Sequence, residues 1–182
     1  MSGSIARRYA KAIFAVAEEQ QTLEPTGAEL QMLRALVADP EIAAGLANPL
    51  LSAAARRDMA RSIAEHLHVG PMVRNFLCLL ADHRRLDHLG GIADQYEKIL
   101  DQSLGRVRAR ITSAVPLSAA QSEAVVGALG RASGRTVLAE QQVDPALLGG
   151  VVVDIEGKIY DGSVRTQLEA LAASIAGGRS LS

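Results

Sequence analysis

Four histidines and two neighbouring aspartates are the side chains best suited to acid–base or metal chemistry. They are His66, His68, Asp82, His83, Asp87 and His88. An imidazole beside a carboxylate is used both in general acid–base catalysis and in zinc sites. A helix presents ligands on one face at spacings of three or four residues, whereas His66 and His68 are two apart. We therefore expect surface histidines near helix ends, and a small hydrolase that uses the two Asp-His pairs remains the enzymatic alternative.

Two further features resemble catalytic motifs only in part. Cys78, the only cysteine, lies in an apolar run, which predicts a buried and inert thiol rather than a nucleophile. Gly149-Gly150 enters a β-branched segment and is not followed by Lys-Ser or Lys-Thr, so it does not fit a phosphate-binding loop. We expect a turn or bulge there. The sequence thus predicts no cofactor and no metal, and it favours an interaction protein over an enzyme.

Composition narrows the class of protein further. The 182 residues are 48% hydrophobic and carry a net charge of −1, which indicates a globular chain of one ordinary domain or two small ones. Aromatic residues make up only 3%, so Leu, Ala, Val and Ile must form the core, as suits closely packed helices. No apolar run approaches the roughly 20 residues that span a bilayer. Any role at a membrane must therefore depend on a partner.

The first part of the chain repeats the apolar spacing of a helical face in six segments, and Pro, Gly or Asn marks all but the last of the breaks between them. We expect helices from Ile5 to about Ala17, from Pro25 to Val37, between Pro40 and Asn48, from Ser52 to about Val69, over 71–80, and from about Leu86 to Leu104. Short connections between helices are typical of a compact bundle. The fold class is therefore mainly α, with a six-helix bundle over residues 1–105.

The period of the pattern changes to two residues at Arg106, which predicts a strand. Ser118 and Gln121 form a capping box at the start of a helix that ends at Gly134. We expect a second strand from Thr136, then a hairpin of Val151–Ile155 with Lys158–Tyr160. A last helix follows, capped by Ser163. Residues 106–182 are thus predicted to form a small α+β domain.

Two apolar stripes run along the first helix, and such a helix must be covered on two sides. One stripe contains Ile5, Tyr9, Ala12, Ile13 and Val16, and the other contains Ala6, Ala10, Phe14 and Ala17. Either the fifth helix covers the second side, or the two helices leave a groove for the amphipathic helix of a partner. The stripes fit both explanations.

Arg106, Arg108 and Arg110 form a ridge on one face of the first predicted strand. Aligned cations repel one another unless acids lie nearby. The ridge is therefore either the solvated side of a half-buried sheet or a contact for an acidic helix of a partner. Nucleic acid is disfavoured as a partner, because the chain is nearly neutral and no aromatic residues interleave with the arginines.

Three motifs resemble those of the ATP synthase delta subunit family, which includes the mitochondrial oligomycin-sensitivity-conferring protein. The first runs from Ala6 to Phe14, and the second combines residues 75–77 with 80–86. The third and most specific motif comprises Gly149, Gly150, Asp161, Gly162, Ser163 and Arg165. The resemblance covers essentially the whole chain in order. The first motif starts at Ala6, so removal of a presequence would also remove the first helix. This position favours a bacterial or otherwise unprocessed protein.

The resemblance implies a non-catalytic connector in the peripheral stalk of a proton-translocating ATP synthase, which keeps the catalytic head from turning with the rotor. Residues 1–105 would bind the N-terminal helix of an alpha subunit, and residues 106–182 would bind the end of the stalk formed by b subunits. A contact with a beta subunit is also compatible with this arrangement. The implied location is the cytoplasmic face of the bacterial inner membrane, reached only through the complex. An unrelated two-domain adaptor is the remaining alternative.

The resemblance also assigns roles to particular residues. The alpha-binding groove is expected between the first and fifth helices, lined by Tyr9, Ala12, Ile13, Val16, Met72, Phe76 and Leu79. Ala12 would let the backbone of a partner approach closely. The b-binding surface is expected at Arg106, Arg108 and Arg110. The residues of the C-terminal motif are assigned a structural role, as the turn and helix cap that shape the second domain.

Overall fold

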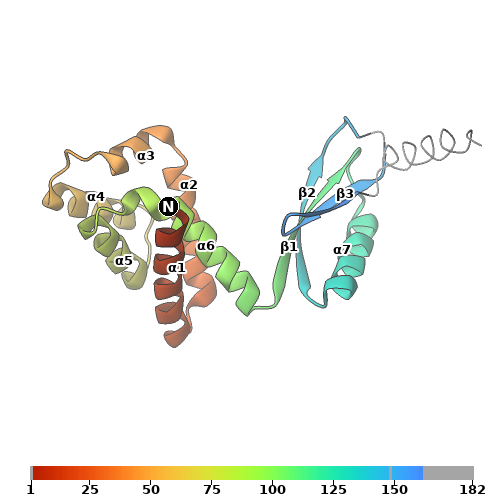
Figure 1. Cartoon of the computed structure of the whole chain (residues 1–182), viewed down its shortest axis with the longest axis horizontal. Helices are drawn as coiled ribbons and strands as arrows, with labels where there is room; N and C mark the ends of the chain where they lie inside the picture. The colour runs from red at the N-terminus through yellow and green to blue at the C-terminus, as the bar shows by residue number, and fades with distance from the viewer. Residues whose placement is uncertain (1, 148, 162–182) are drawn as a thin grey trace, which may run out of the picture. The chain divides into compact units, whose positions relative to one another are not determined.

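The computed structural model describes residues 2–147 and 149–161, and the chain folds into two compact units, Met1–Ser103 and Leu104–Ser182. Figure 1 shows helices alone in the first unit and a sheet with one helix in the second. The mainly α fold class with a mixed second part is thereby confirmed. The partner-binding roles expected of residues 1–105 and 106–182 stay predictions.

The first unit contains six α-helices and one 3₁₀ turn in its described residues. They are α1 (Ser2–Glu19), α2 (Leu23–Val37), α3 (Pro40–Ala47), α4 (Ala53–His66), α5 (Pro71–Asp82), η1 (Leu86–His88) and α6 (Leu89–Ser103). Side chains cap the starts of α3 and α4. The Asp39 carboxylate accepts hydrogen bonds from the amides of Glu41 (2.8 Å) and Ile42, and Ser52 Oγ accepts one from Ala55 N (3.1 Å).

Three helix starts differ from the sequence-based expectation. Helix α1 begins at Ser2 rather than Ile5. Helix α2 begins at Leu23 rather than Pro25, so the proline occupies the first turn. Amides of the first turn have no intrahelical acceptor, and a proline there removes no hydrogen bond. The sixth helix was expected from about Leu86, but residues 86–88 form the 3₁₀ turn η1 and α6 starts at Leu89. Short 3₁₀ turns are common at helix ends.

The core of the first unit is built on the close approach of small side chains. Ala6, Ala10 and Ala17 of α1 are buried, and a Cβ atom placed on Gly91 of α6 would lie 3.5 Å from Ala6 Cβ. Tyr96 of α6 is fully buried, and its hydroxyl donates a 2.9 Å hydrogen bond to the Leu23 carbonyl. Helix α6 therefore packs on both α1 and α2, whereas α4 packs on α5.

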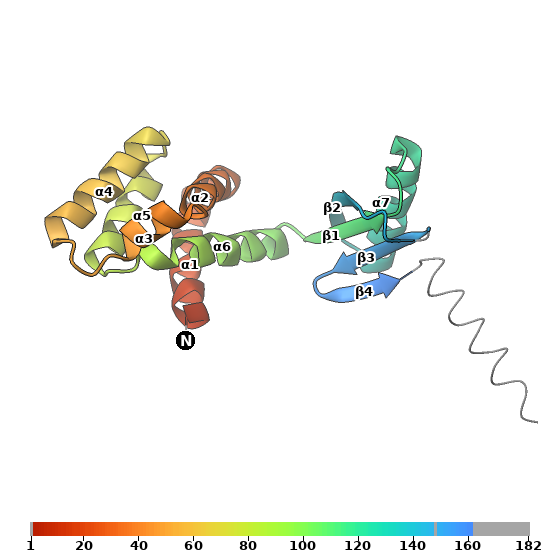
Figure 2. The same ribbon diagram turned by 90° about the horizontal axis from the view of Figure 1, so that it is seen from above.

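The second unit is a four-stranded mixed sheet with one described helix. Its elements are β1 (Arg106–Ser113), α7 (Ala119–Ser133), β2 (Thr136–Val143), β3 (Val151–Ile155) and β4 (Lys158–Asp161). The strand order is β2-β1-β3-β4, with β1 parallel to β2 and antiparallel to β3, as Figure 2 shows from above. Val107, Ala109 and Ile111 of β1 are buried, and partly buried residues of α7 pack against them. The alternating pattern of β1 therefore predicted its buried face correctly.

The turns of the second unit require unusual backbone angles. Gly149 and Gly150 have φ of 146° and 82°, so the glycine pair enters β3 with a backbone that other residues adopt rarely. Glu156 and Gly157 also have positive φ and join β3 to β4 as a tight hairpin. Asp161 ends β4. The expected last helix and its motif residues Gly162, Ser163 and Arg165 lie outside the described residues.

Candidate functional site

Helices α1 and α5 flank an apolar groove of about 780 Å³. Its lining residues are Arg8, Tyr9, Ala12, Ile13, Val16, Gln20, Pro71, Met72, Asn75, Phe76 and Leu79. All seven residues that were assigned to a groove between the first and fifth helices are in this set. The structure thus brings the seven side chains together around one groove.

The two stripes of α1 have different surroundings. The stripe that contains Ala6, Ala10 and Ala17 is buried in the core of the unit. The other stripe borders the groove, where Ala12 is exposed and Val16 retains 41% of its accessible surface. The chain therefore covers the first stripe itself, and in the second stripe it buries Ile13 and leaves Ala12 and Val16 open to solvent.

The residues of α5 that line the groove range from buried to exposed. Phe76 is 8% exposed and its ring lies 6.3 Å from that of Tyr9, edge to face. Met72 is half-buried, and Leu79 is 45% exposed. Large apolar side chains at a solvent-open groove are characteristic of sites that bind a helix of another protein.

Few polar groups line the groove. The carbon of the Arg8 guanidinium lies 5.4 Å from the centre of the Tyr9 ring, within the range of a cation–π contact. Gln20 and Asn75 add uncharged amides. These three residues were not predicted from the sequence. Arg8 and Gln20 share the four-residue spacing of Ala12 and Val16, so an extended stripe would have included them.

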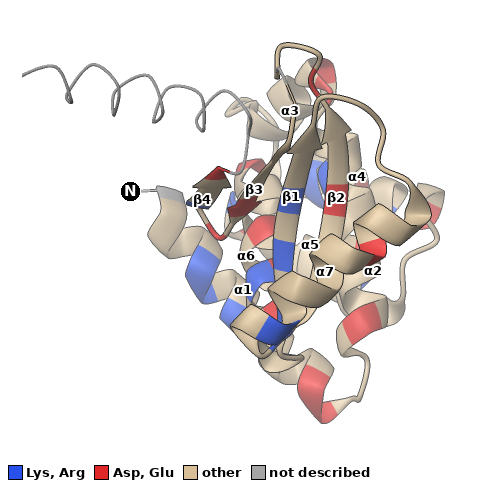
Figure 3. Cartoon of the chain, turned by 90° about the vertical axis from the view of Figure 1, so that its right-hand side faces the viewer, with Lys and Arg blue, Asp and Glu red and all other residues tan. Residues whose placement is uncertain are grey.

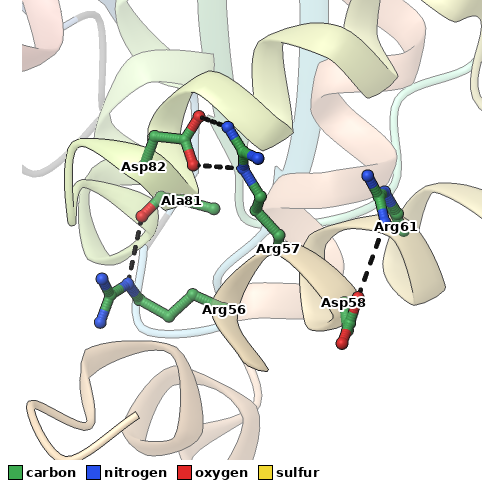
Figure 4. Close-up of polar contacts among 6 residues, drawn as sticks. All are labelled: Arg56, Arg57, Asp58, Arg61, Ala81 and Asp82. Atoms are coloured by element: carbon green, nitrogen blue, oxygen red, sulfur yellow. Dashed lines mark hydrogen bonds and ion pairs between the residues drawn. The ribbon is translucent and has the colours of Figure 1, made fainter. Parts of the chain in front are cut away.

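Two arginines of α4 hold the C-terminal end of α5, as Figure 4 shows. Arg56 is buried, and its Nε donates a 3.1 Å hydrogen bond to the Ala81 carbonyl. Arg57 forms a two-pronged ion pair with Asp82, at 2.5 and 2.7 Å. Hydrogen bonding from Arg57 holds the pKa of the Asp82 carboxyl below its usual range. These contacts fix the helix that forms one wall of the groove.

The Asp-His pairs do not converge on a reaction centre. Asp82 is engaged by Arg57, and His83 is exposed. His88 Nδ1 lies 3.6 Å from Asp87, and its Nε2 lies 3.4 Å from Arg85. Within residues 2–147 and 149–161 no group of three or more His, Cys, Asp or Glu has metal-binding geometry.

The other residues singled out for chemistry lie at the surface or near it. His66 and His68 are exposed at the end of α4, as expected. Cys78 was expected to be buried but is only half-buried. It lies at the edge of the face of α5 that packs against the core. The apolar run around Cys78 therefore predicted the helix correctly and the burial of the thiol incorrectly.

The arginine ridge of β1 lies on the face of the sheet opposite the buried core residues. Arg108 and Arg110 are exposed, and Arg106 is half-buried. Carboxylates flank the ridge, because Arg110 is in register with Glu140 of β2 and with Asp154 of β3. Figure 3 shows blue bands on β1 beside red bands on β2 and β3. The face is therefore mixed in charge rather than basic, which the sequence of β1 alone does not reveal.

Comparisons with known proteins agree on one family. The family model described as "ATP synthase delta (OSCP) subunit" matches residues 5–175. The chain is 44% identical over 176 residues to the ATP synthase subunit delta of Anaeromyxobacter sp. (strain K), covering 96% of this chain and 98% of that one. It is 39% identical over 172 residues to the subunit delta of Geobacter metallireducens, covering 94% and 96%. These relatives are bacterial.

A solved structure supports the fold. A chain in the cryo-EM structure of the Toxoplasma gondii mitochondrial ATP synthase hexamer superposes with a TM-score of 0.69 at 21% identity, over 94% of this chain and 97% of that one. Among the described residues, no helix combines the length and apolarity needed to cross a bilayer.

The family match excludes both the hydrolase and the unrelated adaptor. The chain belongs to the ATP synthase delta (OSCP) subunit family and is a non-catalytic component of the peripheral stalk.

Proposed function

We propose that the groove between α1 and α5 binds the N-terminal helix of an ATP synthase alpha subunit. The observation that carries the proposal is the open apolar stripe of α1 facing the exposed apolar residues of α5. An amphipathic helix would bury Val16, Leu79 and the exposed part of Met72. At about 25 cal/mol per Å² of apolar surface, such burial stabilises a complex substantially.

Ala12 is the residue whose enlargement tests this proposal best. Its side chain lines the groove and is exposed, so Ala12→Leu fills the groove without disturbing the core. We expect the affinity for a peptide of the cognate alpha N-terminal helix to fall about tenfold or more, because the larger side chain sterically blocks close packing of the partner helix in the groove. Isothermal titration calorimetry of the full chain measures the change.

Ala15→Leu is the matched control, because Ala15 is exposed on the same helix and does not line the groove. It should leave the affinity unchanged. Equal affinity of the Ala12→Leu variant and the natural chain would show that the alpha helix binds elsewhere.

The sheet face of β1 is our proposed site for the end of the b-type stalk. Its support is the row of Glu140, Arg110 and Asp154, which offers a helical partner charges of both signs at fixed positions. Through the alpha and b contacts the subunit would join the catalytic head to the stalk and resist the torque of the rotor. A subunit that joins the catalytic head to the stalk could also contact a beta subunit. The protein would act at the cytoplasmic face of the bacterial inner membrane, held there by the complex.

Reversal of one charge tests the sheet contact. In the Arg110→Glu variant three acids stand in one row, so binding of a C-terminal b-subunit fragment should weaken about tenfold, mostly through repulsion. Arg131→Glu is the control, because Arg131 is exposed on α7 and lies outside the sheet face. A similar loss in both variants, measured by calorimetry, would attribute the effect to net charge and contradict the assigned face.

A further inference from the structure

The groove has a cation at its rim for which the described part of the chain supplies no anion. Arg8 lines the groove, and its guanidinium is held against the ring of Tyr9. No carboxylate within residues 2–147 and 149–161 forms an ion pair with it. The other polar residues of the lining, Gln20 and Asn75, carry no charge. Arg8 is therefore the one charged group in a lining that is otherwise neutral.

The surroundings of Arg8 add to its positive charge. The first half of α1 contains Arg7, Arg8 and Lys11, and no acid occurs in the helix before Glu18. Figure 3 marks these cations in blue along α1. The end of the groove at Arg8 is consequently attractive to an anion.

A helix seated in the groove would cover part of the Arg8 side chain. Removing a cation from water is costly unless an anion or hydrogen-bond acceptors replace the lost hydration. Arginine meets this need best with a carboxylate, which accepts two parallel hydrogen bonds from the guanidinium. The Tyr9 ring restricts the position of the guanidinium, and the pair would therefore form at a defined place along the bound helix.

We propose that the helix bound in the α1–α5 groove carries a carboxylate that pairs with Arg8, and that Arg8 thereby selects among helices with the same apolar pattern. The inference rests on the proposed function of the groove. The apolar lining supplies most of the affinity, because it is the larger surface. The Arg8 contact supplies specificity, because a helix without an acid leaves the guanidinium covered and unpaired.

The test is a double-mutant cycle with the full chain and a peptide of the cognate alpha N-terminal helix. Each acidic residue of the peptide is replaced singly by its amide, and binding is measured by calorimetry. One of these replacements should weaken binding to the natural chain about five- to tenfold and should have almost no effect on the Arg8→Gln variant. Arg7→Gln is the matched control, since Arg7 is the neighbouring cation and does not line the groove.

The possible outcomes separate the inference from the function on which it rests. If the replaced acid has the same effect in the natural chain and in Arg8→Gln, the two groups do not interact and the inference is wrong. A peptide without any acid that binds as tightly as one with an acid also contradicts the inference. Failure of the unmodified peptide to bind the natural chain contradicts the groove function itself. Restored binding of an acid-to-Lys peptide by Arg8→Glu would identify the pair directly.

Discussion

The groove of the first unit and the sheet face of the second present opposite kinds of surface. The groove is apolar, with Arg8 as its single charged residue. The sheet face alternates arginines of β1 with carboxylates of β2 and β3. An apolar groove recognises the shape of a partner, and its binding depends little on salt. A row of alternating charges recognises the charge pattern of a partner and weakens as salt screens it.

The described parts of the two units also differ in how many residues they bury. Helix α5 contributes five buried residues to the first unit, whereas α7 contributes none to the second. The buried core of the second unit, within its described residues, consists of Val107, Ala109, Ile111, Val137 and Val153. Among the described residues, equal chemical changes should therefore alter stability more in the first unit than in the second.

The largest expected effect compares one leucine in each unit. Leu77 of α5 is fully buried, whereas Leu129 of α7 is half-buried. Leu77→Ala should lower the free energy of unfolding of its unit by about 3 kcal/mol, because it leaves a cavity in a closed core. Leu129→Ala should cost about 1 kcal/mol, since solvent reaches the vacated space. Hydrogen exchange resolved by unit measures both, and equal losses would contradict the difference in core depth.

An intermediate effect concerns Tyr96, a group with no counterpart in the second unit's described core. Burial raises the pKa of Tyr96 to about 12, whereas an exposed tyrosine titrates near 10. Between these values the unfolded chain loses a proton that the folded unit keeps. The stabilisation is complete below about pH 10 and is lost as the pH rises through 12, by about 3 kcal/mol in all.

Urea unfolding at pH 9 and pH 11 tests this dependence. The loss of stability between the two values should be smaller in Tyr96→Phe than in the natural chain. Tyr160→Phe is the control, because Tyr160 is 57% exposed on β4. An identical pH dependence in the natural chain and in Tyr96→Phe would rule out Tyr96 as its source.

The smallest expected effect involves the ion pair that holds α5 against α4. The pKa of Asp82 is lowered by its hydrogen bonds from Arg57, so the pair stabilises the fold above the usual titration range of a carboxyl. That contribution disappears as the pH falls through the lowered pKa. Asp82→Asn should therefore reduce the melting temperature slightly at pH 6, and the reduction should shrink as the pH falls below the usual titration range of a carboxyl. Asp58→Asn, which removes a more exposed and longer pair, should have no effect over the same pH range.

Local patterns predicted much of this structure. The stripes of α1, the alternation of β1 and the capping box at Ser118 each depend on residues a few positions apart, and each has the structure expected. The groove residues followed from the spacing of two helices together with a family resemblance. The start of α2 was predicted wrongly at Pro25. Proline is tolerated throughout the first turn of a helix, so it marks the region of a helix start and not the first residue.

Contacts between distant segments could not be predicted in this way. The acids beside the arginine ridge come from β2 and β3, and only the strand register places Glu140 and Asp154 next to Arg110. Arg57 and Asp82 are separated by 25 positions, and their pairing depends on how α4 packs against α5. The sequence therefore showed which side chains carry charge, and the fold determined which of those charges are compensated.

We propose that the groove and the sheet face bind different partners. NMR spectra of the full isotope-labelled chain, titrated first with the alpha N-terminal peptide and separately with a C-terminal b-subunit fragment, test it most directly. The peptide should shift the amide signals of α1 and α5, and the fragment should shift those of β1, β2 and β3. Shifts by both partners on the same surface, or shifts by the alpha peptide confined to the sheet, would contradict the account.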